Sequence, residues 1–229
     1  MIGLPLAGLV MHLVFRAYLV RARNFDRAIG RYIERYPEAT AVNIGAGLDT
    51  TFSRADNGKM RWYDLDLPDG IAFRQQFIPE TPRNTCIAKS VFDCGWFNEV
   101  EFRPERGVFF IAGGIFQYFH ESEISGLFDA MAHRFPGGEI IFDAASKLGV
   151  KMANRMVEKT GNKGAPMYFG LGNPVRQISK WSDRIADIEW YSFWHDVPRN
   201  PKWRKRTIWE MNGCDLFGMG KYVQVRFLP

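Results

Sequence analysis

The stretch Ala41–Arg54, "AVNIGAGLDTTFSR", decides the fold class of this sequence. Apolar residues lead into the pattern Gly45-x-Gly47, and an acid, two threonines and an arginine follow it. This order is typical of a buried strand that turns sharply into a helix. The turn is either a plain connection or a place where the backbone approaches a ligand, because glycine has no Cβ and permits positive φ.

Segments with strand-like and helix-like patterns alternate on both sides of this turn. Residues 13–36 are expected to form one or two amphipathic helices, with Asn24 a plausible N-cap. Further helices are expected from Pro68 onward and at 121–135. Strands are expected at 40–45, 60–67, 84–90, 107–114, 137–144, 188–194 and 221–227. Strands that are apolar throughout and alternate with helices indicate a parallel sheet covered on both faces. The sequence therefore predicts a doubly wound, mostly parallel α/β fold.

The composition is that of a folded chain with a large core. The 229 residues are 46% apolar and 15% aromatic, which fits one domain over 1–229. The net charge is only +5, and the densest basic run, "PKWRKR" at 201–206, is interpreted as solvated surface rather than a nucleic-acid arm. The three cysteines are scattered and predict neither a disulfide framework nor a zinc site, so a reducing, cytoplasmic location fits best.

The first fifteen residues, "MIGLPLAGLVMHLVF", are apolar. They lack the basic start and the cleavage site of a signal peptide. Their uninterrupted apolar run is also too short to span a bilayer. We expect a buried helix here and no membrane partner.

Acids follow the glycines at the distance typical of an adenosine site. Asp64 and Asp66 close the second expected strand about 20 residues after the turn, where a carboxylate accepts hydrogen bonds from both ribose hydroxyls. Position 50 is Thr instead of a third glycine, and Asp49 would face a pyrophosphate with negative charge. Both features argue against a dinucleotide. They suit a ligand with adenosine at one end and a cationic centre, such as S-adenosylmethionine (SAM).

Five segments in order resemble the leucine carboxyl methyltransferase family, in particular its branch of polyketide-synthesis O-methyltransferases. The resemblance runs from about Arg16 to Ser146, and the later segment 178–194 also resembles that branch. The five segments are "NIGAGLDTTFSR" (43–54), "WYDLDLP" (62–68), "SVFDCGWFNEV" (90–100), "FFIAGGIFQYFHESEI" (109–124) and "FPGGEIIFDAAS" (135–146).

The resemblance implies a class I SAM-dependent methyltransferase with a seven-stranded Rossmann-like sheet. It would transfer a methyl group to a carboxylate or phenolic hydroxyl of a small molecule. Helices would occupy 1–37, the SAM-binding core 38–149, and a substrate-side insertion with the last strands 150–229. Arg21 matches an arginine that pairs with the SAM carboxylate, Gly45 the glycine beside the amino acid moiety, and Asp66 the ribose acid. The implied cofactor set is Arg21, Gly45, Ala46, Gly47, Asp49, Asp66, Leu67, Ser90, Val91 and Gly113, with Ser90 and Val91 at the adenine edge.

Two departures from the family pattern concern the amino acid end of SAM. The family motif after the fourth strand has an acid that helps to hold the SAM amino group, whereas "AGGIFQY" has Gly113 there. We expect Asp49 to take this role. The family also has a longer N-terminal region that contributes a lysine, and no lysine precedes Lys59. The chain is therefore a natural short form or a truncated one.

Tyr118 and His195 are the candidate catalytic residues. A carboxylate acceptor is ionised at neutral pH, whereas a phenol has a pKa near 10 and benefits from a base such as His195 or His120. The alternatives are a packed Tyr118, a solvent-facing His195, an Asp49 that only caps a helix, and an Arg54 that only pairs with Asp49 or Asp64. No metal-ligand pattern is visible in the sequence. A non-catalytic SAM-binding descendant and, less favoured, a nucleotide-cofactor oxidoreductase remain as alternative functions.

Overall fold

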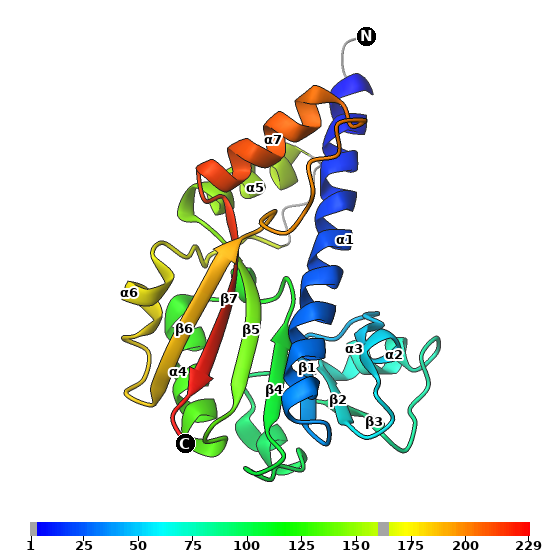
Figure 1. The fold of residues 1–229 in the computed structure, drawn as a ribbon, viewed down its shortest axis with the longest axis vertical. Coiled ribbons are helices and arrows are strands. Elements are labelled where there is room, and N and C mark those ends of the chain that lie inside the picture. The colour runs from blue at the N-terminus through cyan, green and yellow to red at the C-terminus, as the bar shows by residue number, and fades with distance from the viewer. Residues whose placement is uncertain (1–3, 160–164) are drawn as a thin grey trace.

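The computed structural model describes residues 4–159 and 165–229, and its strands form one twisted sheet (Figure 1). The strand order is β3-β2-β1-β4-β5-β7-β6, and β7 alone is antiparallel to its neighbours. This arrangement confirms the doubly wound, mostly parallel seven-stranded sheet that the sequence predicts. The strands are β1 (Thr40–Ile44), β2 (Arg61–Asp66), β3 (Asn84–Ala88), β4 (Val108–Ala112), β5 (Glu139–Ala145), β6 (Ile185–Ser192) and β7 (Gly220–Phe227).

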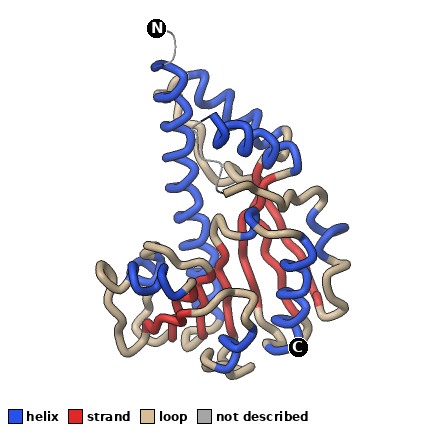
Figure 2. Tube along the Cα trace, turned by 180° about the vertical axis from the view of Figure 1, so that it is seen from behind, coloured by secondary structure: helices blue, strands red, loops and turns tan. Residues whose placement is uncertain are grey.

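Helices cover both faces of the sheet (Figures 1 and 2). Helix α1 (Leu4–Arg35) crosses one face, and α4 (Glu121–Arg134) lies on the other. In the described part of the chain, no helix is long and apolar enough to cross a membrane. The remaining helical elements are α2 (Thr51–Ala55), α3 (Pro68–Arg74), η1 (Cys94–Asn98), η2 (Phe116–Tyr118), α5 (Lys147–Lys159), α6 (Pro174–Ile178) and α7 (Lys205–Leu216).

Helix α1 is continuous, so the prediction of an N-cap at Asn24 is wrong. The Asn24 side chain instead donates to the carbonyl of Val20 at 3.0 Å, as a residue inside a helix does. Phe25, Ala28, Ile29 and Tyr32 are all buried with helical spacing, and this apolar stripe holds the helix on the sheet. The predicted burial of the first fifteen residues falls on side chains outside the described residues.

Alternate strand residues build two core layers. In β1, Val42 and Ile44 pack into the layer beneath α4, whereas Ala41 packs into the layer beneath α1. The tryptophans differ in burial, and the sequence does not predict which of them are buried. Trp181 and Trp194 are buried, but Trp209 on α7 is 75% exposed.

A buried ion pair joins the end of α3 to the centre of β2. Arg74 and Asp64 have side chains only 2% and 0% exposed, and Arg74 Nη2 lies 2.7 Å from Asp64 Oδ2. The other Asp64 oxygen accepts from Asn43 Nδ2 at 3.0 Å and from Trp62 Nε1 at 2.9 Å. Both oxygens of the buried carboxylate are therefore satisfied, as such a group requires.

We predict that Arg74→Met destabilises the protein by about 3–5 kcal/mol, because it leaves the Asp64 charge buried without its cation. Arg106→Met is the control, since Arg106 pairs with Glu38 at 3.3 Å on the surface. It is expected to cost less than about 1 kcal/mol. Urea unfolding of both variants measures the difference. Equal losses would show that the Arg74 pair is no more important than a surface one.

Candidate functional site at the carboxyl edge of the sheet

The glycine turn lies at the carboxyl end of β1, beside the point where strand order reverses between β1 and β4. Gly45 and Gly47 have φ of +69° and +46°, which explains why both are glycine. The N–H groups of Gly45 and Ala46 both donate to the carbonyl of Leu65, at 2.8 and 3.1 Å. The turn is thus bound to the end of β2, where the predicted ribose acid lies.

Asp66 connects β2 directly with this turn. Its Oδ2 accepts from the Gly47 N–H at 2.7 Å, and its Oδ1 accepts from the Leu67 N–H at 2.7 Å. The residue is partly exposed, and each oxygen can accept more than its one backbone hydrogen bond. Leu67 and Leu48 beside it are 52% and 50% exposed. The predicted contacts Gly45, Ala46, Gly47, Asp66 and Leu67 therefore lie together.

A second glycine turn follows β4 and touches the first. A Cβ on Gly45 would lie 2.5 Å from Ile115 Cδ1, so the two turns are in van der Waals contact. Gly114 has φ of +69°, and a Cβ there would lie 2.8 Å from Arg21 Nη1. Gly113 has no room for a side chain either, because its Cβ would lie 2.7 Å from the ring of Phe25. The motif "AGG" thus provides space for two residues of α1.

Arg21 reaches this second turn from α1. Its Nε and Nη2 lie 3.0 and 2.8 Å from Asp143 Oδ2, at the end of β5. Burial lowers the pKa of Arg21, but the nearby Asp143, Tyr222 and Tyr18 together raise the pKa above its ordinary value, with Asp143 contributing most of the rise. Burial and Asp143 also raise the pKa of Tyr222, which keeps that phenol neutral. Asp143 has no counterpart among the residues that the sequence predicts.

The structure shows the partners of Asp49 and Arg54. Asp49 Oδ1 accepts from the N–H of Thr51, the first residue of α2, although the N-cap position of that helix is Thr50. Arg54 does not pair with Asp49 or Asp64, because its Nε lies 2.7 Å from Asp26 Oδ2 on α1. The partner of Asp64 is Arg74, whose Nη1 also donates to the carbonyls of Gly47 and Asp49 at 2.9 and 2.7 Å. The buried pair therefore also supports the glycine turn.

Ser90 and Val91 follow β3 and lie beyond Asp66. The Lys89 N–H donates to the Asp66 carbonyl at 2.9 Å, which fixes the path of the chain into this segment. Val91 is buried and its carbonyl accepts from Trp96 Nε1, whereas Ser90 is partly exposed. Of the two, Ser90 is thus the more accessible for a ligand edge.

The two catalytic candidates are not brought together. Tyr118 ends η2, directly after the second glycine turn, and is 39% exposed. His195 lies in the turn after β6, and its side chain is 63% exposed. The contacts of the His195 ring are Asp196, at 3.7 Å, and the Tyr191 ring. Neither belongs to the glycine turns, so the structure favours the solvent-facing interpretation of His195.

A chain segment lies across the ends of β4 and β5 on the α4 side. The N–H groups of Tyr168 and Phe169 donate to the Gln117 carbonyl, at 2.7 and 3.2 Å. Lys221 Nζ donates to the Leu171 and Gly172 carbonyls, and burial lowers its pKa. A cavity of about 190 Å³ lies beneath this segment, and its lining residues include His120, Lys147 and Tyr168.

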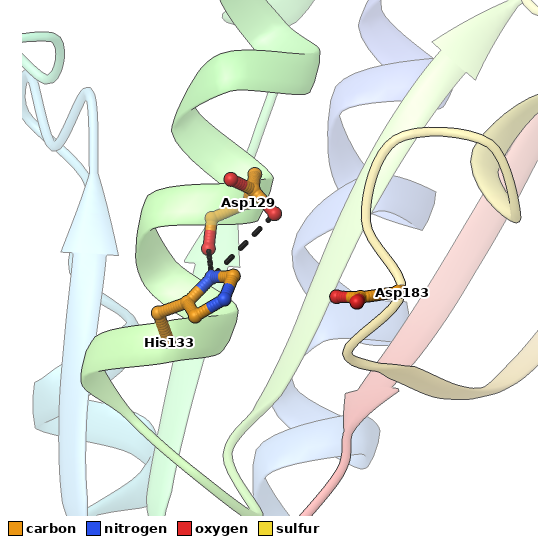
Figure 3. A group of neighbouring side chains, drawn as sticks. All are labelled: Asp129, His133 and Asp183. Carbon is orange, nitrogen blue, oxygen red and sulfur yellow. Dashed lines mark hydrogen bonds and ion pairs between the residues drawn. The ribbon is translucent and has the colours of Figure 1, made fainter.

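Two other features lie at the opposite end of the sheet. A groove of about 400 Å³ between α1 and β7 is lined by charged residues, including Arg35 and Glu139, and by none of the predicted site residues. Asp129, His133 and Asp183 place three possible metal-ligand atoms within 4.8 Å of one another (Figure 3). His133 and Asp183 are exposed, and such groups commonly gather without an ion, so we assign no metal to them.

Comparison with known proteins agrees with this geometry. Residues 7–132, more than half of the chain, match the family model of the leucine carboxyl methyltransferases. The chain belongs to the leucine carboxyl methyltransferase family. It is also 28% identical over 162 residues to the tetracenomycin polyketide synthesis O-methyltransferase TcmP of Streptomyces glaucescens. The matched region is 69% of this chain but 58% of TcmP, so the chain spans little more than half of that relative.

Solved structures share the fold of this leucine carboxyl methyltransferase family member at low identity. A DUF574 family protein from Streptomyces avermitilis superposes with a TM-score of 0.65, at 13% identity, over 93% of this chain and 87% of that one. Human N-acetylserotonin methyltransferase in complex with SAM gives 0.57, at 10% identity, over 89% and 52%. Magnesium protoporphyrin IX methyltransferase from Synechocystis, with bound S-adenosylhomocysteine (SAH), gives 0.53, at 12% identity, over 91% and 84%.

We predict that restoring the family acid with Gly113→Glu lowers stability by about 1–3 kcal/mol and gives no gain in SAH affinity. The new Cβ would collide with the Phe25 ring at 2.7 Å, which is overpacking of the core. Gly30→Ala is the control, because its Cβ meets nothing within 4 Å inside α1. It is expected to stabilise by about 0.5–1 kcal/mol. Thermal melts and SAH calorimetry test both, and tighter SAH binding by Gly113→Glu would refute the steric argument.

Proposed function

We propose that this chain binds SAM across the carboxyl edge of β2, β1, β4 and β5 and transfers its methyl group to an oxygen of a small molecule. One observation carries the proposal. A continuous line of contacts runs from the Asp66 carboxylate through the two glycine turns to the Arg21 guanidinium. Open-sheet α/β proteins bind ligands at this edge, beside the switch point.

The groups along this line fit the chemistry of SAM from end to end. Asp66 offers carboxylate lone pairs to ribose hydroxyls. Leu48 and Leu67, both about half exposed beside it, offer apolar surface to the adenosine part. At the far end, Arg21 Nη1 lies against Gly114, and its positive charge suits the carboxylate of an amino acid. Bound there, SAM would supply a methyl group on a sulfonium, which is already an activated leaving group.

The chain's own task is then to hold its partners in line. Gly45 and Gly47 let the backbone approach the ligand, and the Asp66 and Arg74 contacts fix the turn that they form. Holding reactants in a near-attack geometry supplies much of a rate enhancement. A carboxylate acceptor needs no base, whereas a phenol does. Tyr118, exposed after the second glycine turn, is the better placed of the two candidates for contact with an acceptor.

Oxygen is the proposed acceptor atom because the relative TcmP is an O-methyltransferase. The chain would act as one domain over 1–229, with the segment after 150 on the acceptor side. Its partner would be a small molecule in the cytoplasm, with no nucleic acid involved. A non-catalytic SAM-binding protein is the second candidate, because Phe25 fills the space where the family has an acid.

The deciding experiment is calorimetry with SAM, SAH and NAD, followed by an assay with methyl-labelled SAM and a panel of phenols and carboxylic acids. The proposal expects binding of SAM and SAH, no binding of NAD, and transfer to at least one acceptor. SAM binding without transfer to any member of a broad panel would favour the non-catalytic protein. Binding of NAD in place of SAM would refute the proposal.

We predict that Asp66→Ala weakens SAM and SAH binding about tenfold or more. The variant loses a charged hydrogen-bond acceptor, which typically costs about 1.5–3 kcal/mol. Asp69→Ala is the control, because Asp69 is an exposed acid three residues further on, in the first turn of α3. It should bind both ligands like the parent. Unchanged SAM affinity in a folded Asp66→Ala protein would remove Asp66 from the site.

A further inference from the structure

We propose that Asp143 is the positioning residue of the amino acid end of this site: it orients Arg21 and fixes the Gly113–Gly114 turn. The inference rests on the proposed function, because it concerns the same ligand. It adds a second acid to the one expected at Asp49, whose contact with the SAM amino group stays a prediction. One Asp49 oxygen accepts from the Thr51 N–H at the start of α2.

The contacts of Asp143 use both of its oxygens. Oδ2 accepts a hydrogen bond from Arg21 Nε at 3.0 Å and lies 2.8 Å from Arg21 Nη2. Oδ1 accepts a hydrogen bond from the Gly114 N–H at 2.5 Å. The side chain is only 7% exposed, and it lies on the same face of β5 as Ile141, which packs with the residues of α1. A carboxylate in this state has little capacity left for a ligand ammonium group. Asp143 therefore acts through Arg21 and through the backbone rather than by direct contact.

The geometry leaves one nitrogen of Arg21 for the ligand. Nε and Nη2 are held by Asp143, whereas Nη1 is the atom nearest to a Cβ built on Gly114. A guanidinium fixed on one edge by a carboxylate loses less rotamer freedom when its other edge binds. The charges then alternate from Asp143 through Arg21 to the ligand carboxylate. This arrangement favours a ligand that carries an amino acid over one that lacks it.

A second ion pair joins the same two elements and provides a matched control. Arg35, near the end of α1, lies 3.1 Å from Glu139 Oε1, at the start of β5. The Glu139 side chain is 6% exposed, close to the value for Asp143. The Arg35–Glu139 pair lies at the opposite end of β5 from the glycine turns. Removing its charge therefore perturbs the α1–β5 contact without touching the proposed site.

The test compares Asp143→Asn with Glu139→Gln in the full chain, using SAH and 5′-methylthioadenosine, which lacks the amino acid. Asp143→Asn should weaken SAH binding at least tenfold and change methylthioadenosine binding less than twofold. Glu139→Gln should bind both like the parent. In an Arg21→Ala background, Asp143→Asn should cause a clearly smaller further loss, because the part of its effect that passes through Arg21 is already absent and only its bond to the Gly114 N–H remains to be lost.

Three results would overturn the inference. Unchanged SAH affinity in Asp143→Asn would make the residue structural only, and so would equal losses for the two ligands. Equal losses of SAH affinity in Asp143→Asn and Glu139→Gln would show that breaking either ion pair between α1 and β5 has the same effect, so that Asp143 has no special role.

If Asp143→Asn does not fold, Arg21→Lys takes its place, because a lysine keeps the charge but not the forked geometry. Arg21→Lys should lose affinity for SAH and keep its affinity for methylthioadenosine. Equal losses of affinity for the two ligands would again overturn the inference. A parent that binds neither ligand refutes the proposed function itself.

Discussion

The buried ion pair between Asp64 and Arg74 is the interaction on which the rest of the site depends. Arg74 donates to Asp64 on β2 and to the carbonyls of Gly47 and Asp49 in the first glycine turn. One guanidinium thus fixes the end of α3, the centre of β2 and the turn after β1. A fork of five fixed donors suits this task better than a lysine. Arg74 thus holds the turn from the protein side, so the solvent side of the turn remains accessible to a ligand.

The same edge shows why glycines recur in the two turns for different reasons. Gly47 needs its positive φ, and nothing lies within 4 Å of a Cβ built there. Gly113 is instead a glycine because Phe25 fills the adjacent space. Gly45 and Gly114 combine positive φ with close neighbours. The acid that the family resemblance implies at position 113 would have no room beside that ring.

The sequence predicts the sheet well because each strand has a local pattern. The seven expected strands all form, with ends that differ by a few residues, and Gly47 and Asp66 meet as their spacing suggests. The ion pairs were not predictable in this way. Arg21 and Asp143 lie 122 residues apart, and Arg54 finds Asp26 on α1 rather than a nearby acid. Such pairs leave no periodic signal, because they arise only when the fold brings distant segments together. The prediction of an N-cap at Asn24 was wrong for a related reason. Tertiary packing of Phe25 and Ile29 stabilises a helix that continues through this residue.

Helix α1 links stability with ligand binding. Arg35 pairs with the first residue of β5 and Arg21 with its fifth, so the helix is held at both ends of one strand. Fourteen residues of helix span about 21 Å, whereas four steps of a strand span about 13 Å. The long arginine side chains make up the difference. Between these pairs, the buried stripe from Phe25 to Tyr32 prevents the helix from sliding along the sheet. The position of Arg21 is thus set by core packing and by its pair with Asp143, so the proposed amino acid end of the site is organised before a ligand arrives.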